Sequence, residues 1–200
     1  MINTVIFDYG NTLVRFSKKE LAESYTENDE DAALITDLFL SDEYWQKLDE
    51  GTLTHEAWIA AAQKRLPERL HPLLQTIADT WYYRLPEIEG MAELVKRLKA
   101  RGIKLYLLSN ISNAFAAHIA DFPLLALFDG IVCSAVYQTV KPEPRLYEIL
   151  IDTYRLATNS CIFIDDRQDN LDAAAKFGIT PYLFEGDASK LSAYLDTVLA

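Results

Sequence analysis

Short apolar runs alternate with longer amphipathic stretches along most of this chain. Five runs rich in β-branched, aromatic and leucine residues have the length of buried strands. They cover Thr4–Phe7, Ile103–Leu108, Gly130–Cys133, Cys161–Ile164 and Pro181–Phe184. From the second run onward, an amphipathic stretch separates each run from the next. This alternation predicts an α/β fold with a doubly wound parallel sheet and right-handed crossovers.

The amphipathic stretches predict the helices that cover this sheet. Apolar residues recur at helical spacing in three of them, and Gly102 and Gly178 follow two of these as helix terminators. The three expected helices are Glu89–Arg101, Pro144–Tyr154 and Leu171–Phe177, and a further helix is expected over Ile111–Ala120.

The segment between the first and second strands follows a different pattern. Residues 17–86 show helical periodicity without a convincing strand, and Pro86 marks the return to the alternating pattern. We therefore predict an all-helical cap domain at 17–86, inserted into a core formed by residues 1–16 and 87–200. The expected cap helices are Asp29–Leu40, Asp42–Asp49, His55–Leu66 and Pro72–Tyr83.

Polar residues follow four of the predicted strands, at the edge where a parallel sheet gathers its ligands. Asp8 follows the first strand and Ser109 the second, Lys141 comes after the third, and Asp165 and Asp166 follow the fourth. Carboxylates from two strand ends can hold one Mg²⁺. The lysine, the serine hydroxyl and turn amides suit a phosphate group. The pattern predicts a phosphate site with a carboxylate nucleophile beside it.

These motifs, in this order, resemble the haloacid dehalogenase-like hydrolase superfamily. The match covers nearly the whole chain, because the helical insert resembles the superfamily's cap. The combination is most similar to a bacterial helical-cap phosphatase subgroup that includes an α-D-glucose-1-phosphate phosphatase. The resemblance implies a Rossmann-like core and a Mg²⁺-dependent phosphatase. The motifs are Asp8-Tyr9-Gly10-Asn11, Leu108-Ser109-Asn110, Lys141-Pro142-Glu143-Pro144 and Asp165-Asp166-Arg167-Gln168-Asp169-Asn170.

The resemblance also implies how the acidic residues act. Asp8 is expected to attack phosphorus and form an aspartyl phosphate, which water then hydrolyses. Asp8, the main-chain carbonyl of Gly10 and Asp166 are the expected Mg²⁺ ligands, and Asp165 is expected to orient the metal's water shell.

The expected phosphate site uses the remaining motif residues. Ser109 and Lys141 bind the phosphoryl oxygens, and Lys141 also offsets the charge of the nucleophile. Main-chain amides around Tyr9, Gly10 and Asn110 complete the cradle.

Gly10 departs from the superfamily pattern, because most of its phosphatases carry an aspartate there. That aspartate protonates the leaving alkoxide, and such general acid–base help contributes about 10²–10⁴-fold to the rate. Three explanations stay open. The substrate has a good leaving group, such as an anomeric or acyl phosphate; a cap residue or a metal-ordered water supplies the proton; or the protein binds its ligand with weakened catalysis.

The favoured function is hydrolysis of a small phosphometabolite, most simply a sugar phosphate such as a hexose 1-phosphate. A 2-haloacid dehalogenase is the alternative enzyme, since it also uses an aspartate nucleophile. Dehalogenases of this superfamily need no metal and carry tyrosine at the position of Gly10, so the Asp165–Asp166 pair favours the phosphatase. A non-catalytic protein that binds a phosphorylated ligand is the third possibility.

Other polar and aromatic residues have simpler expected roles. Ser109 and Asn110 also suit helix caps, and Asp169 and Asn170 suit the cap of the helix at Leu171. Arg145 is expected to pair with Glu148 or Glu143. Substrate contacts from the cap are expected at Tyr44, Trp45 and the loop 50–53.

Composition limits the binding partners that the protein is expected to have and the cellular compartment in which it is expected to lie. A net charge of −11 argues against binding of nucleic acid. The chain lacks a signal-peptide pattern and a run of eighteen apolar residues, so a cytoplasmic protein without membrane contact is expected. Cys133 and Cys161 lie in strand-like runs and are expected to be buried thiols. The oligomeric state has no signature in the sequence.

Overall fold

One five-stranded parallel sheet forms the centre of the computed structural model, which describes residues 2–199. Its order, β3-β2-β1-β4-β5, is that of a doubly wound sheet, so the predicted fold class is confirmed. Two strands have the predicted bounds, β4 differs by one residue at one end, and β2 and β5 are each displaced by one residue. The strands are β1 (Thr4–Phe7), β2 (Lys104–Ser109), β3 (Gly130–Cys133), β4 (Cys161–Asp165) and β5 (Thr180–Leu183).

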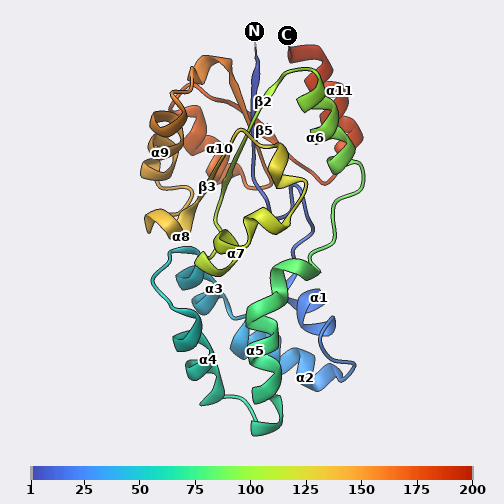
Figure 1. Ribbon diagram of the computed structural model, residues 1–200, viewed down its shortest axis with the longest axis vertical. Coiled ribbons are helices and arrows are strands. Elements are labelled where there is room, and N and C mark those ends of the chain that lie inside the picture. The colour runs from blue at the N-terminus through green and yellow to red at the C-terminus, as the bar shows by residue number, and fades with distance from the viewer. Residues whose placement is uncertain (1, 200) are drawn as a thin grey trace.

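Side chains of the strands alternate between two apolar layers. Val5 and Phe7 face the layer that includes α6 (Met91–Ala100) and α11 (Ala188–Val198). Ile6 faces the other, with α9 (Pro144–Tyr154) and α10 (Gln168–Ala175). Figure 1 shows these helix pairs on opposite sides of the sheet. The central strands β2, β1 and β4 are therefore buried on both faces over nearly their whole length, which explains why they read as continuous apolar runs.

The elements that the structure describes between β1 and α6 are helical. The predicted helix at 29–40 is divided, because α2 ends at Leu34 and a π-helical turn follows over Ile35–Phe39. The cap helices are α1 (Lys18–Glu23), α2 (Asp29–Leu34), α3 (Asp42–Asp49), α4 (His55–Gln63) and α5 (His71–Thr80). The cap boundaries at 17 and 86 remain a prediction.

The cap lies beyond the carboxyl ends of the strands, and β1 runs toward it (Figure 1). Trp58 and Leu74 of the cap belong to the same buried apolar cluster as Phe7 and Phe115 of the core. A continuous apolar cluster therefore holds the cap over the edge of the sheet where the predicted site residues lie.

Several short helices differ from the predictions. The helix expected at 111–120 is reduced to α7 (Asn113–Ala117), and α1, α8 (Ser134–Tyr137) and α11 were not predicted. Within residues 2–199, no helix is long and apolar enough to cross a membrane. Cys133 and Cys161 are buried and free, as predicted.

Candidate active site

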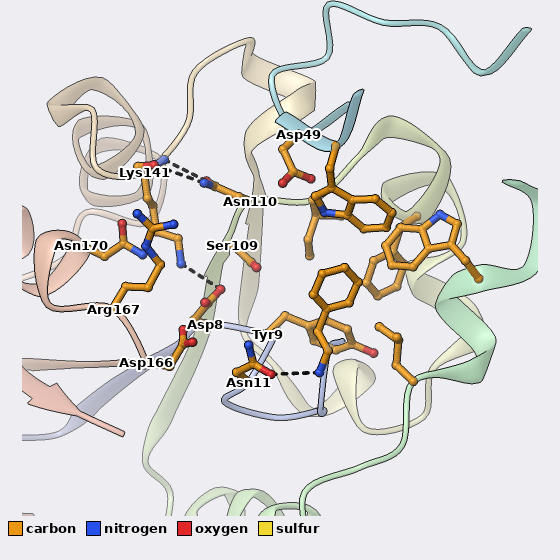
Figure 2. A pocket seen from close by; sticks show the side chains of 17 residues that line it. Asp8, Tyr9, Asn11, Asp49, Ser109, Asn110, Lys141, Asp166, Arg167 and Asn170 are labelled. Atoms are coloured by element: carbon orange, nitrogen blue, oxygen red, sulfur yellow. Dashed lines mark hydrogen bonds and ion pairs between the residues drawn. The ribbon is translucent and has the colours of Figure 1, made fainter. Parts of the chain in front are cut away.

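The carboxyl ends of three neighbouring strands bring the predicted residues together. Asp8 follows β1 directly, Ser109 is the last residue of β2, and Asp165 ends β4 with Asp166 next to it. From β1, strands β2 and β3 follow on one side of the sheet, whereas β4 and β5 lie on the other side. The strand order therefore reverses between β1 and β4, and the crevice there is the switch point of the sheet. Lys141 reaches the same crevice from the loop after α8 (Figure 2).

Lys141 is the centre of this cluster. Its Nζ lies 2.8 Å from Asp8 Oδ1 and 2.7 Å from Asp165 Oδ2, and its side chain is 1% exposed. Burial alone lowers the pKa of a lysine, but the two carboxylates outweigh it and raise the pKa of Lys141. The lysine is therefore charged over the whole physiological range of pH.

Hydrogen bonds to neighbouring loops fix both Lys141 and Asp165. The Asn110 side chain accepts a hydrogen bond from the Lys141 amide at 2.8 Å and donates one to the Lys141 carbonyl at 3.2 Å. Asn170 Nδ2 donates to both oxygens of Asp165 at 3.0 Å, and the Arg167 amide donates to Asp165 Oδ1 at 2.8 Å. Asp165 therefore holds both Lys141 and the turn that follows β4.

The Asp8 carboxylate has fewer hydrogen-bond partners than the Asp165 carboxylate. Although Lys141 is close to Asp8 Oδ1, the direction is poor for a hydrogen bond, and this buried oxygen accepts none from the described residues. Burial raises the pKa of Asp8 to about 6, against the opposing effects of Lys141 and Ser109. Without further positive charge, the Asp8 carboxylate is therefore an unstable anion at its site.

The cluster fits a divalent cation. One oxygen each from Asp8, Asp165 and Asp166 lies within 4.8 Å of the others. That spacing is comparable with a magnesium coordination sphere, which is roughly 4 Å across. Burial, and then the charge of Asp165, raise the pKa of Asp166 as well. Two destabilised carboxylates with an orphaned buried oxygen are what a hard cation would neutralise.

A cavity of about 220 Å³ opens beside these groups. Tyr9, Gly10, Asn11, Asn110 and Arg167 also line its polar side (Figure 2). The structure therefore places the predicted motif residues of the core at or beside one cavity.

The opposite side of the cavity is aromatic. Phe16 and Trp45 have ring centroids 4.9 Å apart, Trp45 and Trp81 are 4.7 Å apart, and Trp81 lies 5.8 Å from Phe115. These four rings come from the core and the cap together, and Leu85 and Ile111 extend the same wall. We call Phe16, Trp45, Trp81 and Phe115 the aromatic wall.

Two expected helix caps were wrong. Ser112, not Ser109 or Asn110, caps α7 through a hydrogen bond to Phe115 N. Helix α10 begins at Gln168 without a side-chain cap, so the expected capping by Asp169 and Asn170 was wrong. Asp169 pairs with Arg167 instead.

The predicted cap contacts were partly right. Trp45 lines the cavity, but Tyr44 and the loop 50–53 do not, because the end of α3 turns Asp49 toward the cavity instead. Asp49, Trp81 and Arg167 were not predicted as site residues. Arg167 follows an identified motif directly, whereas Asp49 and Trp81 are brought to the site by the packing of the cap. Arg145 pairs with Glu148 at 3.3 Å, as expected.

Comparisons with known proteins agree with the motifs. The family model described as haloacid dehalogenase-like hydrolase matches residues 2–178. Phosphatase MT3486 of Mycobacterium tuberculosis is 29% identical over 114 residues, which are 51% of this chain and 52% of that protein. The chain thus spans about half, or less, of the length of the first curated relatives that it matches.

Solved structures share the fold at low identity. A HAD family enzyme from Bacteroides thetaiotaomicron, in complex with magnesium and inorganic phosphate, has a TM-score of 0.70 at 19% identity, covering 96% of this chain and 99% of that one. The L-2-haloacid dehalogenase of Xanthobacter autotrophicus has a TM-score of 0.66 at 19% identity, covering 100% of this chain and 89% of that one.

Proposed function

This chain belongs to the haloacid dehalogenase-like hydrolases, and on that premise we propose that it is a Mg²⁺-dependent phosphomonoesterase of a small phosphorylated metabolite. One observation carries the proposal: a buried Lys141 shared by Asp8 and Asp165, beside a further carboxylate and the Ser109 hydroxyl. The arrangement combines a cationic phosphate contact with a metal-binding edge, as phosphoryl transfer requires.

In the proposed reaction Asp8 attacks phosphorus and expels the leaving group, which gives an aspartyl phosphate that water hydrolyses. Asp8, the Gly10 carbonyl and Asp166 would hold Mg²⁺. When bound, the ion would supply positive charge that offsets the carboxylates and the phosphoryl group. Asp165 would orient the water shell of the ion, and its 2.7 Å ion pair holds the lysine.

The other predicted residues form the proposed phosphate cradle. Ser109 Oγ donates a hydrogen bond to one phosphoryl oxygen and Lys141 Nζ contacts another. Main-chain amides of Tyr9, Gly10 and Asn110 supply further donors. Asn110 also fixes Lys141 through its two hydrogen bonds to that residue's main chain.

The leaving group would lie against the aromatic wall. Hexose 1-phosphates remain the first candidate substrates, because an anomeric oxygen leaves readily and a sugar ring can lie flat on an indole. The wall also suits a flat or apolar alcohol, since it offers few hydrogen-bonding side chains. A substrate panel therefore needs both kinds of ester.

Dehalogenation of a 2-haloacid is the second candidate. Its support is the shared fold of the Xanthobacter dehalogenase and a relative from Burkholderia cepacia, (S)-2-haloacid dehalogenase 4A, 25% identical over 138 residues. The cluster of three carboxylates argues for a metal-dependent reaction instead.

A panel of phosphate esters and 2-chloropropionate, assayed with Mg²⁺ and with EDTA, separates these functions. We expect phosphate release that needs Mg²⁺ and that falls to background in Asp8→Asn. Chloride release that EDTA does not affect would favour the dehalogenase. Binding of Mg²⁺ without turnover of any ester would favour a phospho-ligand binding protein.

A further inference from the structure

The missing acid at Gly10 directs attention to the other carboxylates of the cavity. Among the described residues that line it, three carry a carboxylate: Asp8, Asp166 and Asp49. The first two belong to the cation cluster, whereas Asp49 comes from the cap. In Figure 2 its carboxyl group points inward, toward the space around Ser109 and Asn110.

Contacts between the cap and the core hold Asp49 in this position. It is the last residue of α3, and its carbonyl accepts a 2.6 Å hydrogen bond from the buried Ser134 hydroxyl. The same hydroxyl accepts a 2.9 Å hydrogen bond from Ile111 N, so one core residue joins the end of α3 to the segment beside Asn110. Gly51 packs so closely that a Cβ there would lie 2.3 Å from the Ala135 carbonyl oxygen.

The Asp49 side chain itself has no internal partner. Its carboxylate forms no hydrogen bond or ion pair with any residue in the range 2–199. A partly buried acid that is fixed at its main chain, free at its carboxyl group and directed into a substrate cavity is available to a ligand.

We propose that Asp49 is the general acid of the reaction and supplies from the cap the proton that Gly10 cannot. This assignment rests on the proposed phosphatase function. As Asp8 forms its bond to phosphorus, the bond from phosphorus to the ester oxygen breaks, and that oxygen takes the Asp49 proton to leave as an alcohol. The Asp49 carboxylate regains a proton from the water that then attacks the aspartyl phosphate, which restores Asp8 and releases inorganic phosphate.

The charges around Asp49 favour its acidic form. Burial, and then the negative charge of Asp8, raise the pKa of Asp49 well above its usual range. Glu50 acts in the same direction, while Lys18 and Lys141 oppose the shift. A carboxyl group that keeps its proton closer to neutral pH is a better acid catalyst.

The chain also offers a rescue experiment. Gly10 has no positive φ, and a Cβ at this position would meet Phe16 Cβ at 3.8 Å, an ordinary contact. The Cβ of a side chain at position 10 therefore meets no close contact. Gly10→Asp can restore to an Asp49→Asn enzyme the acid that the superfamily places there.

The test compares kcat/KM for an alkyl phosphate and for 4-nitrophenyl phosphate, since kcat/KM reports the steps up to loss of the leaving group. In Asp49→Asn we expect a fall of about 100-fold or more for the alkyl ester and only a few-fold for the nitrophenyl ester, whose phenolate needs little protonation. The basic limb of the kcat/KM–pH profile should also disappear, and Gly10→Asp should recover at least tenfold for the alkyl ester.

Glu43→Gln is the matched control, because Glu43 lies on the same helix, is exposed and pairs with Lys47 instead of lining the cavity. Equal loss in Glu43→Gln, or a similar fall for both esters with an unchanged pH profile, would assign Asp49 a structural role and overturn the proposal. Hydrolysis of neither ester by the wild type would overturn the phosphatase function itself, and the role of Asp49 with it.

Discussion

At the scale of single residues, Lys141 determines the charge balance of the site, because it pairs with both Asp8 and Asp165. Lys141 is the counter-charge of two buried carboxylates, and its loss would leave both of them unpaired. The cluster leaves one net negative charge at Asp8 and Asp165, which a cation can offset. The cluster is therefore arranged to hold a metal ion.

Lys141→Met should destabilise the protein, because it leaves two carboxylates buried without a counter-charge. We expect a loss of about 3–5 kcal/mol in the free energy of unfolding at pH 7.5. The loss should be smaller at pH 5, where Asp8, with its raised pKa, takes up a proton. Denaturant titration measures it, with exposed Lys176→Met as a control near zero. A loss below 1 kcal/mol at pH 7.5 would contradict this account of the cluster.

The raised pKa of Asp8 predicts how stability depends on pH in the absence of metal. The folded state holds the Asp8 proton up to about pH 6, while the unfolded chain releases it near 3.8. Folding therefore loses stability as pH rises through this window, by about 3 kcal/mol for a shift of about two units.

In EDTA, Asp8→Asn should thus gain stability relative to the wild type between pH 4 and pH 7. Mg²⁺ should then raise the melting temperature of the wild type but not that of the variant. Differential scanning calorimetry across this pH range checks both expectations. A difference between the two proteins that does not change with pH would show that Asp8 carries no such burial penalty.

At the scale of elements, the contact between the end of α3 and α8 links the cap to the chemistry. Gly51 has φ +68° and meets the main chain of Ala135, so any side chain there must displace the cap loop. Two residues before Gly51, the Asp49 carbonyl accepts a hydrogen bond from the Ser134 hydroxyl. This small interface fixes both the position of the cap relative to the core and the position of the proposed acid.

Gly51→Ala should destabilise the protein by more than the strain of a positive φ alone, because the new Cβ also meets the main chain of Ala135. Gly102→Ala is the matched control, because Gly102 has φ +79° with open space around its Cβ position. We expect about 1 kcal/mol of destabilisation in the control and about 1–3 kcal/mol more in Gly51→Ala. Thermal unfolding of both variants measures this difference. Equal destabilisation of the two variants would mean that the cap loop moves away from Ala135 without a loss of stability.

The sequence predicted the core elements better than the contacts between core and cap. The runs Thr4–Phe7 and Gly130–Cys133 are strands with the predicted bounds, because buried parallel strands carry a strong local signal. Helix α11 also has a signal that the prediction overlooked: Asp187 as the N-cap, then Leu191 and Leu195 one turn apart.

Asp49 could not have been predicted in the same way. Its sequence context is an acidic residue at the end of an amphipathic helix, which is ordinary for an exposed surface. Its position depends on the packing of Gly51 and Ser134, which are 83 residues apart in the chain. The role of Asn110 in holding Lys141 depends likewise on two loops that meet only in the folded protein.

At the scale of the whole molecule, one apolar cluster joins the cap and one face of the sheet. Both cysteines lie buried in the core, and burial raises the pKa of Cys133 to about 12 and that of Cys161 to about 11. The thiols therefore report on global unfolding, since the thiolate is the reactive form.

Neither cysteine should react with 5,5′-dithiobis(2-nitrobenzoate) in the folded protein at pH 8. Both should react within minutes in denaturant, and at intermediate denaturant the rate should follow the unfolding curve. Counting released thiolate by absorbance checks this expectation. Fast reaction of one thiol in buffer would indicate that its side of the sheet opens locally.

In the proposed reaction, Asp8 carries the phosphoryl group from the substrate to water. Rapid acid quench of the enzyme during turnover with Mg²⁺, followed by peptide mass spectrometry, detects this intermediate. We expect one phosphoryl group on the peptide that contains Asp8, and none in Asp8→Asn. Continued phosphate release by Asp8→Asn, or a phosphoryl group on another residue, would contradict it.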